Sequence, residues 1–262
     1  MVRAMATREL GTDIKNVLIT GASSGMGRSL AGWFARRGAR VYAAARRLEA
    51  LEQLSEETKV AGGNIEAVRM DVNEHEETVE QIRKLDERCG GLDVVVANAG
   101  IGGETDGKKL RWEDVEKILR VNVTGSAATL CAALPRMVER RRGHLVGISS
   151  IAAWRGLAKR GAYCGSKAFL STFLESLRAD LRGTGVKVTT VHPGFVRSEL
   201  TAKNTFKMPF ILETEDAAER IGKAILRGAR ELSFPWQLSL PGRSMKLLPR
   251  ALLEAAERSL TR

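Results

Sequence analysis

Tyr163 and Lys167 stand four positions apart in the sequence, a spacing that places two side chains on one face of a helix. A phenol that titrates near ~10 is a poor acid–base catalyst at neutral pH. A neighbouring ammonium group favours the phenolate and brings the pKa of the phenol toward the working range. We therefore expect Tyr163 to transfer a proton to or from a substrate oxygen, with Lys167 lowering its pKa.

Ser150 lies 13 residues before Tyr163, in the pair Ser149-Ser150. Its hydroxyl would hydrogen-bond the same substrate oxygen and fix its position. Taken singly, a Tyr and a Lys four apart are usually a surface pair, and two serines after a strand usually form a turn. The case for a catalytic site therefore depends on what else the sequence places with them.

A glycine-rich turn at 21–27 (Gly-Ala-Ser-Ser-Gly-Met-Gly) follows an apolar run at 16–20 that is typical of a buried parallel strand. Gly21 allows a sharp exit from the strand, Gly25 lets the backbone approach a pyrophosphate, and Gly27 lets the next helix pack closely. The start of that helix offers N–H groups and a positive dipole end to an anion. A glycine-rich turn alone is weak evidence, but its place between strand and helix indicates a nucleotide site. The predicted residues of this turn are Gly21, Ser23, Ser24, Gly25, Met26 and Gly27.

The segment 43–47 (Ala-Ala-Ala-Arg-Arg) is expected to end the second strand and bears on the choice of nucleotide. An NAD site usually has an acidic residue there, which accepts hydrogen bonds from the ribose hydroxyls. This segment has no acid, and a fork formed by Arg46 and Arg47 suits a 2′-phosphate. The sequence thus favours NADP(H) and leaves NAD(H) as the second choice. The alternative is that both arginines simply begin a solvated helix.

Strands and helices are expected to alternate along the chain. Apolar runs predict strands at 16–20, 40–45, 65–70, 92–97, 144–149 and 186–192, and helical patterns follow the glycine turn up to 37 and lie near 48–61, 74–88, 112–141, 161–183 and 215–230. This alternation predicts one α/β domain with a doubly wound parallel sheet and helices on both faces. We expect the domain at 15–240, a flexible arm at 1–14, a substrate loop near 195–215 and an amphipathic tail at 241–262.

Composition excludes several classes of protein. Of the 262 residues, 44% are hydrophobic and 28% charged, which is ample for a large core and argues against disorder. The three cysteines and three histidines show no metal-ligand spacing, so we expect reduced thiols and no metal. The longest uncharged stretch, 121–135, is too short and too polar to span a bilayer, and the N-terminus lacks the apolar region of a signal peptide. We expect a cytoplasmic protein.

The net charge of +11 favours anionic partners without choosing among them. The densest basic run, 140–142 (Arg-Arg-Arg), is expected to end a helix and to face water. Because no nucleic-acid motif accompanies it, we expect no nucleic-acid partner. The tail at 241–262 mixes leucines with arginines and suits a subunit contact, a lid or a weak contact with an acidic membrane surface.

Further motifs follow in the same order as in a known family. They are 97–100 (Ala-Asn-Ala-Gly) after the fourth strand, Asn122 in Val-Asn-Val, the Ser149-Ser150 pair, 163–167 (Tyr-Cys-Gly-Ser-Lys) and 192–196 (His-Pro-Gly-Phe-Val). With the glycine turn, this set resembles the short-chain dehydrogenases/reductases from residue 20 to about 198. The sequence departs from the family pattern at Ala97 for Asn, Gly165 for Ala and Ser198 for Thr, none of which removes a reacting group.

The resemblance implies a Rossmann-type oxidoreductase, and specifically a carbonyl reductase or alcohol dehydrogenase that exchanges a hydride with NADP(H). It implies the catalytic residues Asn122, Ser150, Tyr163 and Lys167. Lys167 would also hold the nicotinamide ribose, and Asn122 would hold a water molecule in a proton relay. Further cofactor contacts are expected from Asp71, Val72, Asn98, Gly100, Pro193, Gly194 and Val196. Asp71 has the alternative role of a helix cap, and His192 and Cys164 are expected to be packed core residues.

The resemblance also implies a small-molecule substrate and a homodimer or homotetramer formed through 112–141 and 161–183. Those helices carry Leu130, Leu134, Met137, Phe169, Phe173 and Leu177, which would otherwise all be core. The loop at 195–212 carries Leu200, Phe206, Met208, Phe210 and Ile211, an apolar set that predicts a lipophilic substrate. A catalytically idle NADP-binding sensor or scaffold is the alternative, against which the intact Ser150, Tyr163 and Lys167 argue.

Overall fold

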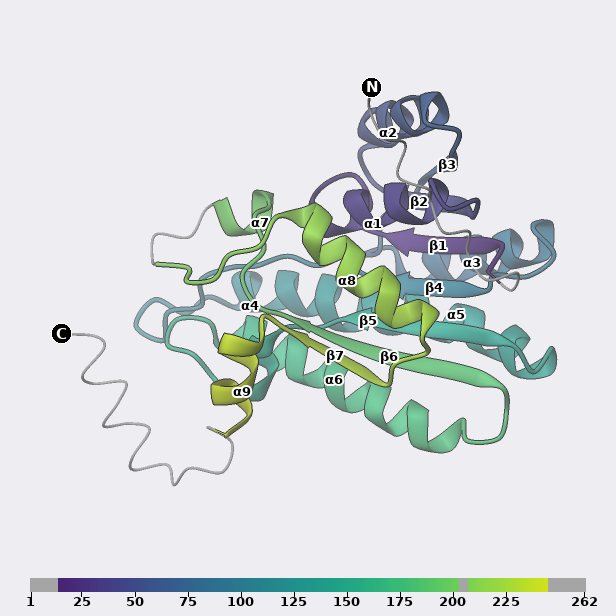
Figure 1. The fold of residues 1–262 in the computed structure, drawn as a ribbon. Coiled ribbons are helices and arrows are strands. Elements are labelled where there is room, and N and C mark those ends of the chain that lie inside the picture. Colours follow the sequence, from purple (N-terminus) through teal and green to yellow (C-terminus); the bar gives the residue numbers. More distant parts are fainter. Residues whose placement is uncertain (1–13, 203–206, 245–262) are drawn as a thin grey trace.

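In the computed structural model, which describes residues 14–202 and 207–244, parallel strands form one seven-stranded sheet between two layers of helices (Figure 1). The order across the sheet is β3-β2-β1-β4-β5-β6-β7. This confirms the predicted doubly wound α/β fold. The strands are β1 (Asn16–Thr20), β2 (Arg40–Ala45), β3 (Asn64–Arg69), β4 (Val94–Ala97), β5 (Gly143–Ile148), β6 (Val186–Pro193) and β7 (Glu231–Phe234).

Two apolar cores lie on the two faces of this sheet. Val17 and Ile19 of β1 point to one face, which is covered by α1 (Gly25–Ala35), α2 (Leu48–Val60) and α8 (Thr214–Leu226). Leu18 points to the other face, which is covered by α3 (His75–Arg88), α5 (Ser126–Glu139) and α6 (Gly161–Asp180). Successive side chains of a strand alternate between faces. Strands covered on both faces therefore need apolar residues throughout, which explains the continuous apolar runs in the sequence.

The strand order reverses beside β1, which pairs with β2 on one side and with β4 on the other. Segments leaving the carboxyl ends of β1 and β4 diverge toward opposite faces, and doubly wound proteins bind ligands in the crevice between such ends. The glycine-rich turn follows β1 and Asn98 follows β4, so both lie at this edge.

The helix predicted at 112–141 is interrupted. It consists of α4 (Trp112–Leu119), a π-helical turn η1 (Arg120–Gly125) and α5. Within the described part of the chain, this stretch from Trp112 to Glu139 passes the length and composition test for a membrane-spanning helix. Half of its most apolar segment is buried inside the fold, as in the core helix of a soluble protein. Length and composition alone are therefore weak evidence that it spans a membrane.

Four short elements were not predicted from the sequence. They are β7, the 3-10 helix η2 (Ile151–Trp154), α7 (Glu199–Ala202) and α9 (Trp236–Ser244). β7 pairs with β6 and extends the sheet by one strand. α9 packs against β7 and η2 and runs across the predicted boundary between 240 and 241. The arm up to residue 13 and the tail from 245 lie outside the described residues.

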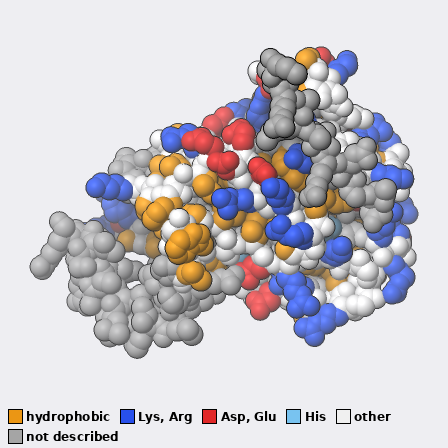
Figure 2. All heavy atoms as spheres, in the orientation of Figure 1, with side chains coloured by type: hydrophobic (Ala, Val, Ile, Leu, Met, Phe, Trp, Pro, Cys, Tyr) orange, Lys and Arg blue, Asp and Glu red, His pale blue; other side chains and the backbone are white. Residues whose placement is uncertain are grey.

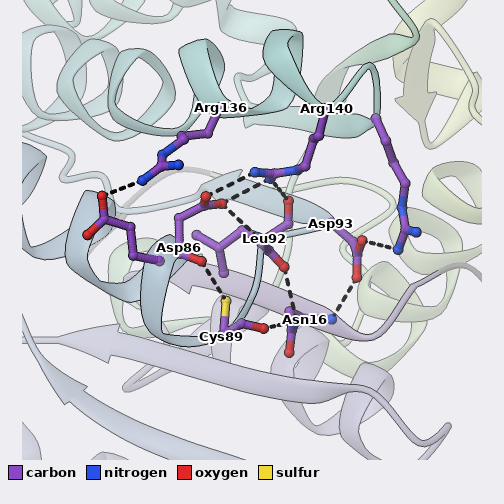
Figure 3. Close-up of polar contacts among 10 residues, drawn as sticks. Asn16, Asp86, Cys89, Leu92, Asp93, Arg136 and Arg140 are labelled. Atoms are coloured by element: carbon purple, nitrogen blue, oxygen red, sulfur yellow. Dashed lines mark hydrogen bonds and ion pairs between the residues drawn. The ribbon is translucent and has the colours of Figure 1, made fainter.

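The basic run at 140–142 ends α5, and Arg141 and Arg142 are exposed as expected, whereas Arg140 is turned toward the amino edge of the sheet and is mostly buried (Figure 3). The Arg140 guanidinium donates to both carboxylate oxygens of Asp86, each at 2.9 Å, and Asp86 is only 3% exposed. Arg142 pairs with Asp93, whose other oxygen accepts from the backbone N–H of Asn16 at 2.9 Å. Buried carboxylates retain their charge only when paired and hydrogen-bonded, and here the basic run supplies the partners.

Candidate active site

The glycine-rich turn has the backbone that its sequence predicts. Gly21 and Gly25 have φ values of +68° and +56°, in the left-handed region that glycine adopts readily. A Cβ atom on Gly27 would lie 2.4 Å from both the carbonyl oxygen of Gly21 and Nδ2 of Asn98. No side chain fits there, so the turn closes tightly onto the start of α1 and presents its N–H groups at the crevice.

Asn98 holds this turn to the end of β4. Its side-chain Nδ2 donates to the carbonyl oxygens of Thr20 at 2.8 Å and Gly21 at 3.2 Å. The backbone N–H of Asn98 donates to the hydroxyl of Thr20 at 3.2 Å. Asn98 therefore lies beside the glycine-rich turn at the carboxyl edge of the sheet, and its amide fixes the backbone of that turn.

Three of the four predicted catalytic residues come together at the end of β5 and the start of α6. Tyr163 and Lys167 share one face of α6, with Lys167 Nζ 5.9 Å from the centre of the Tyr163 ring. Ser150 follows β5 and forms a hydrogen bond with the Tyr163 hydroxyl. Ser150 Oγ also accepts from the backbone N–H of Ala152 at 3.1 Å, which caps η2 and fixes the hydroxyl. A substrate oxygen placed at this pair would meet both hydroxyls.

Asn122 lies within the π-helical turn η1 and is fully buried. Its Oδ1 accepts from the N–H of Ile101 at 2.8 Å, and its Nδ2 donates to the carbonyl oxygen of Ile101 at 2.9 Å and to Ser166 Oγ at 3.0 Å. The amide thus clamps the loop after β4 against α6. A Cβ on Gly100, in the same loop, would be 3.4 Å from Asn122 Oδ1 and 3.2 Å from Lys167 Nζ.

The electrostatics of Tyr163 and Lys167 differ from expectation. Burial raises the pKa of Tyr163, with the hydrogen bond from Ser150 acting in the opposite direction. Burial lowers the pKa of Lys167 to about 8. The pKa of Tyr163 is thus shifted upward, opposite to the expected lowering by the ammonium. The cause is the cost of placing charge in a low-dielectric site.

Asp71 and Val72 follow β3 as predicted. The contacts of Asp71 show that it is not the N-cap residue of α3, which was the alternative role. Asp71 Oδ1 accepts from the backbone N–H of Asn73 at 3.0 Å, so its side chain closes the turn before α3. Glu74, not Asp71, is the N-cap residue of α3. Val72 is buried beside η1, where a Cβ on Gly125 would be 2.7 Å from its carbonyl oxygen.

The unpredicted strand β7 positions the turn at 193–196. The N–H of Gly194 donates to the carbonyl oxygen of Phe234 at 2.7 Å, and Pro193 pairs with Phe234 in the sheet register. Val196 is buried and forms an isolated bridge with Leu212, which closes the base of the loop that follows. These contacts hold the three predicted cofactor residues of this turn at the carboxyl edge.

The two arginines after β2 differ in their contacts. Arg46 is exposed. Arg47 donates from Nη2 to Ser23 Oγ at 3.2 Å and forms an ion pair with Glu199 at 3.0 Å. Glu199 was not predicted from the sequence, where the available signal was an acidic residue three positions after the 192–196 motif.

A line of buried polar groups beneath the catalytic residues was also missed. Ser149 Oγ donates to the carbonyl oxygen of Lys167 at 2.9 Å and lies 2.8 Å from Ser171 Oγ. Ser171 Oγ in turn lies 3.1 Å from His192 Nε2, and His192 Nδ1 lies 3.1 Å from Glu231. His192 and Cys164 are buried, as expected of packed residues. The positions of Ser149, Ser171 and His192 in the sequence give no indication that their side chains meet.

The apolar loop at 195–212 is described only in part. Phe206 lies outside the described residues. Leu200 is 40% exposed, and its side chain would be 3.6 Å from a Cβ on Gly102, in the loop after β4. Phe210 is 53% exposed with a φ of 56°, which is costly for a bulky residue. Figure 2 shows further hydrophobic side chains at the surface near the start of α9, which carries the exposed Trp236.

The fold and this site together define a class, the nucleotide-dependent oxidoreductases of the doubly wound type. A family model described as short chain dehydrogenase matches residues 15–208. The chain belongs to the short-chain dehydrogenase/reductase family and is an NAD(P)-dependent oxidoreductase that acts on CH–OH groups.

Similar proteins agree with this assignment. An uncharacterized oxidoreductase of Myxococcus xanthus (strain DK1622) is 61% identical over 246 residues, which cover 94% of this chain and 97% of that protein. An alcohol dehydrogenase from the archaeon Thermococcus sibiricus, complexed with 5-hydroxy-NADP, is 27% identical with a TM-score of 0.75 and covers 84% of this chain and 96% of that one. A family member from Burkholderia phymatum in complex with NAD is 23% identical with a TM-score of 0.81, over 93% and 95% of the two chains.

The residues at the crevice fit a nicotinamide dinucleotide. The tight turn at Gly21, Gly25 and Gly27 leaves backbone N–H groups for a pyrophosphate. Lys167 is buried, and among the described residues its ammonium donates one hydrogen bond, to the carbonyl oxygen of Ile148, although it has three N–H donors. A buried ammonium with donors to spare suits the hydroxyls of a ribose.

Proposed function

We propose that this protein is an NADP(H)-dependent carbonyl reductase of lipophilic ketones or aldehydes, which oxidises the corresponding alcohols in reverse. The end of β2 carries the cofactor part of this proposal, because Arg46 and Arg47 follow three alanines with no acid among them. A guanidinium group binds a phosphate through parallel charge-assisted hydrogen bonds, which the ribose hydroxyls of NAD cannot match.

The chain's own residues account for the proton and for the position of the substrate. When bound, the nicotinamide cofactor supplies or accepts the hydride. In reduction Tyr163 donates its hydroxyl proton to the carbonyl oxygen, and in oxidation it takes the proton back. Ser150 donates a hydrogen bond to the same oxygen and holds it beside the phenol. Lys167 donates to the ribose hydroxyls and keeps a positive charge near Tyr163.

The apolar surface after the 192–196 turn supports a lipophilic substrate. Leu200 faces the loop after β4 that also contains Gly100, next to Lys167 and Asn122. Phe210 is exposed in a strained backbone conformation, and such strain is retained mainly where a function requires it. Apolar side chains that close over a ligand exclude water from the reacting carbonyl.

The cofactor preference and the lipophilic substrate are both tested by measuring the oxidation of NADPH and NADH with a series of linear ketones of rising chain length. Each buried methylene should improve kcat/KM by up to ~0.8 kcal/mol, about fourfold. Leu200→Asn should reduce this slope, whereas Leu226→Asn, an equally exposed leucine of α8, should not. A flat series would contradict the lipophilic substrate.

The cofactor preference has its own control. Arg46→Ala should weaken NADPH by about tenfold to a hundredfold and leave NADH nearly unchanged, because ~1.5–3 kcal/mol is lost with each charge-assisted bond. Arg83→Ala removes an exposed arginine of α3 and should affect neither cofactor. Equal kcat/KM for NADPH and NADH in the wild-type protein would reject the preference.

A further inference from the structure

Glu199, the first residue of α7, binds the guanidinium of Arg47 with both carboxylate oxygens. Arg47 Nη1 donates to Oε1 and Nη2 to Oε2, each at 3.0 Å. Ser24 Oγ donates to Oε2 at 3.2 Å, and Arg47 also donates to Ser23 Oγ. The carboxylate of Glu199 therefore lies between the glycine-rich turn and the end of β2.

These two segments meet where a doubly wound fold places the adenosine ribose of a dinucleotide. In such folds an acidic residue after β2 accepts from the ribose hydroxyls of NAD, and an arginine there accommodates the 2′-phosphate of NADP. Here β2 is followed by arginines only, but Glu199 brings a carboxylate to Arg47 from 152 positions further along the chain. The carboxylate occupies the guanidinium edge that a 2′-phosphate would use.

We propose that Glu199 is a specificity-determining residue for the cofactor. This inference rests on the proposed function. A 2′-phosphate must displace Glu199 from Arg47, whereas NAD(H) binds with the ion pair intact. Glu199 consequently weakens NADP(H) binding selectively and narrows the difference in affinity that the arginines create.

The expected size of the effect follows from the exposure of the pair. The side chains of Arg47 and Glu199 are 51% and 63% exposed, and an ion pair of this kind changes an equilibrium by up to about fivefold. Glu199→Gln should therefore tighten NADPH binding by up to about fivefold and change NADH binding by less than about twofold.

Dissociation constants for NADPH and NADH, measured by calorimetry without substrate, test this directly. They are compared in the wild-type protein, Glu199→Gln, Arg47→Ala and the double variant. Because Glu199 acts through Arg47, its substitution should have no effect on NADPH binding in the Arg47→Ala background. Glu213→Gln is the matched control, since it removes the ion pair between Glu213 and Arg197 of the same segment.

Tighter NADPH binding that needs Arg47 and spares NADH supports the inference. It is overturned by unchanged NADPH binding, by equal changes for both cofactors, or by an effect that persists in the Arg47→Ala background. The wild-type ratio of the two constants tests the proposed cofactor preference separately. The inference concerns the change in that ratio on Glu199→Gln, so the two can fail independently.

Discussion

The ammonium nitrogen of Lys167 lies 2.8 Å from the carbonyl oxygen of Ile148, at the end of β5. This hydrogen bond anchors the lysine side chain to the sheet and aims it past Tyr163 toward Gly100. A single neutral acceptor compensates little of the cost of burying the charge, which is why burial lowers the pKa of Lys167 to about 8. The buried charge of Lys167 therefore lowers the stability of the folded protein at neutral pH.

The stability of the nucleotide-free protein should rise with pH because of Lys167. Its pKa is about 8 in the folded state against 10.5 in the unfolded state. Below pH 8 the cost of the buried charge is fully present. Between these values the unfolded state binds the extra proton, so the free energy of unfolding increases with pH, by up to roughly 3 kcal/mol in all.

Urea unfolding of wild type and Lys167→Met between pH 7 and 9.5 isolates this contribution. The Met variant should be the more stable at pH 7, and its advantage should shrink as the pH rises. A difference between the two proteins that stays constant over this range would contradict the lowered pKa.

Tyr163→Phe should lower kcat by about 10²–10⁴-fold, because it removes the acid proposed to protonate the substrate oxygen. The dissociation constant for NADPH should stay within about twofold of wild type, since the phenol ring and Lys167 remain. Stopped-flow measurement of hydride transfer, with calorimetry for binding, separates the two effects. Retention of most of kcat would reject Tyr163 as the acid.

Ser150→Ala should also lose most activity, and Ser149→Ala is its matched control. Ser149 bonds Lys167 only at the backbone and lies next to Ser171. Removing its buried hydroxyl should cost about 1–2 kcal/mol of stability with little change in kcat. Thermal unfolding and steady-state rates distinguish the loss of activity in Ser150→Ala from the loss of stability in Ser149→Ala. Equal losses of kcat in the two variants would contradict a catalytic role for Ser150 alone.

Arg140→Ala should destabilise the fold by about 3 kcal/mol, because it leaves the buried carboxylate of Asp86 without its cation. Arg136 is the matched control. It lies on α5, pairs with Glu87 on the surface and is exposed together with its partner (Figure 3). Arg136→Ala should change stability little, since exposed pairs contribute little. Similar urea midpoints for the two variants would argue against the buried pair.

Phe169→Lys should lower the molecular mass in solution if the protein is the expected dimer or tetramer. Phe169 is 39% exposed on α6 and stacks on Phe173 with ring centres 5.6 Å apart. Leu130 and Met137, also expected at the contact, are instead fully buried core residues. Light scattering at micromolar concentration measures the mass, and a monomeric wild type would reject the oligomer.

Strong local patterns explain which elements could be predicted. β1 and β2 have the predicted bounds because each is an apolar run closed by a glycine or by charged residues. β7 has only four residues, Glu-Leu-Ser-Phe, and depends on pairing with β6 for its existence. The π-helical turn is set by the fit of α4 and α5 to different neighbours, and no local signal marks it.

In the candidate site, too, some residues follow from local sequence patterns and others depend on tertiary contacts. Tyr163, Lys167 and Ser150 are brought together by one helix and one strand whose lengths the sequence indicates. Glu199 reaches Arg47 only through folding of the segment after β6, and the lowered pKa of Lys167 arises from burial. Contacts and solvation of this kind belong to the tertiary structure, so residue types and spacing do not reveal them.

The π-helical turn at 120–125 has a consequence for insertions and deletions. A π-turn holds one residue more than an α-turn, so α4 and α5 are out of register with each other by one position, or about 100° of rotation. Deleting one residue there would produce a more regular helix with better local hydrogen bonds. It would also rotate Leu130 and Met137 away from the sheet or release Asn122 from Ile101. The length of the stretch from α4 to α5 is therefore fixed to within one residue.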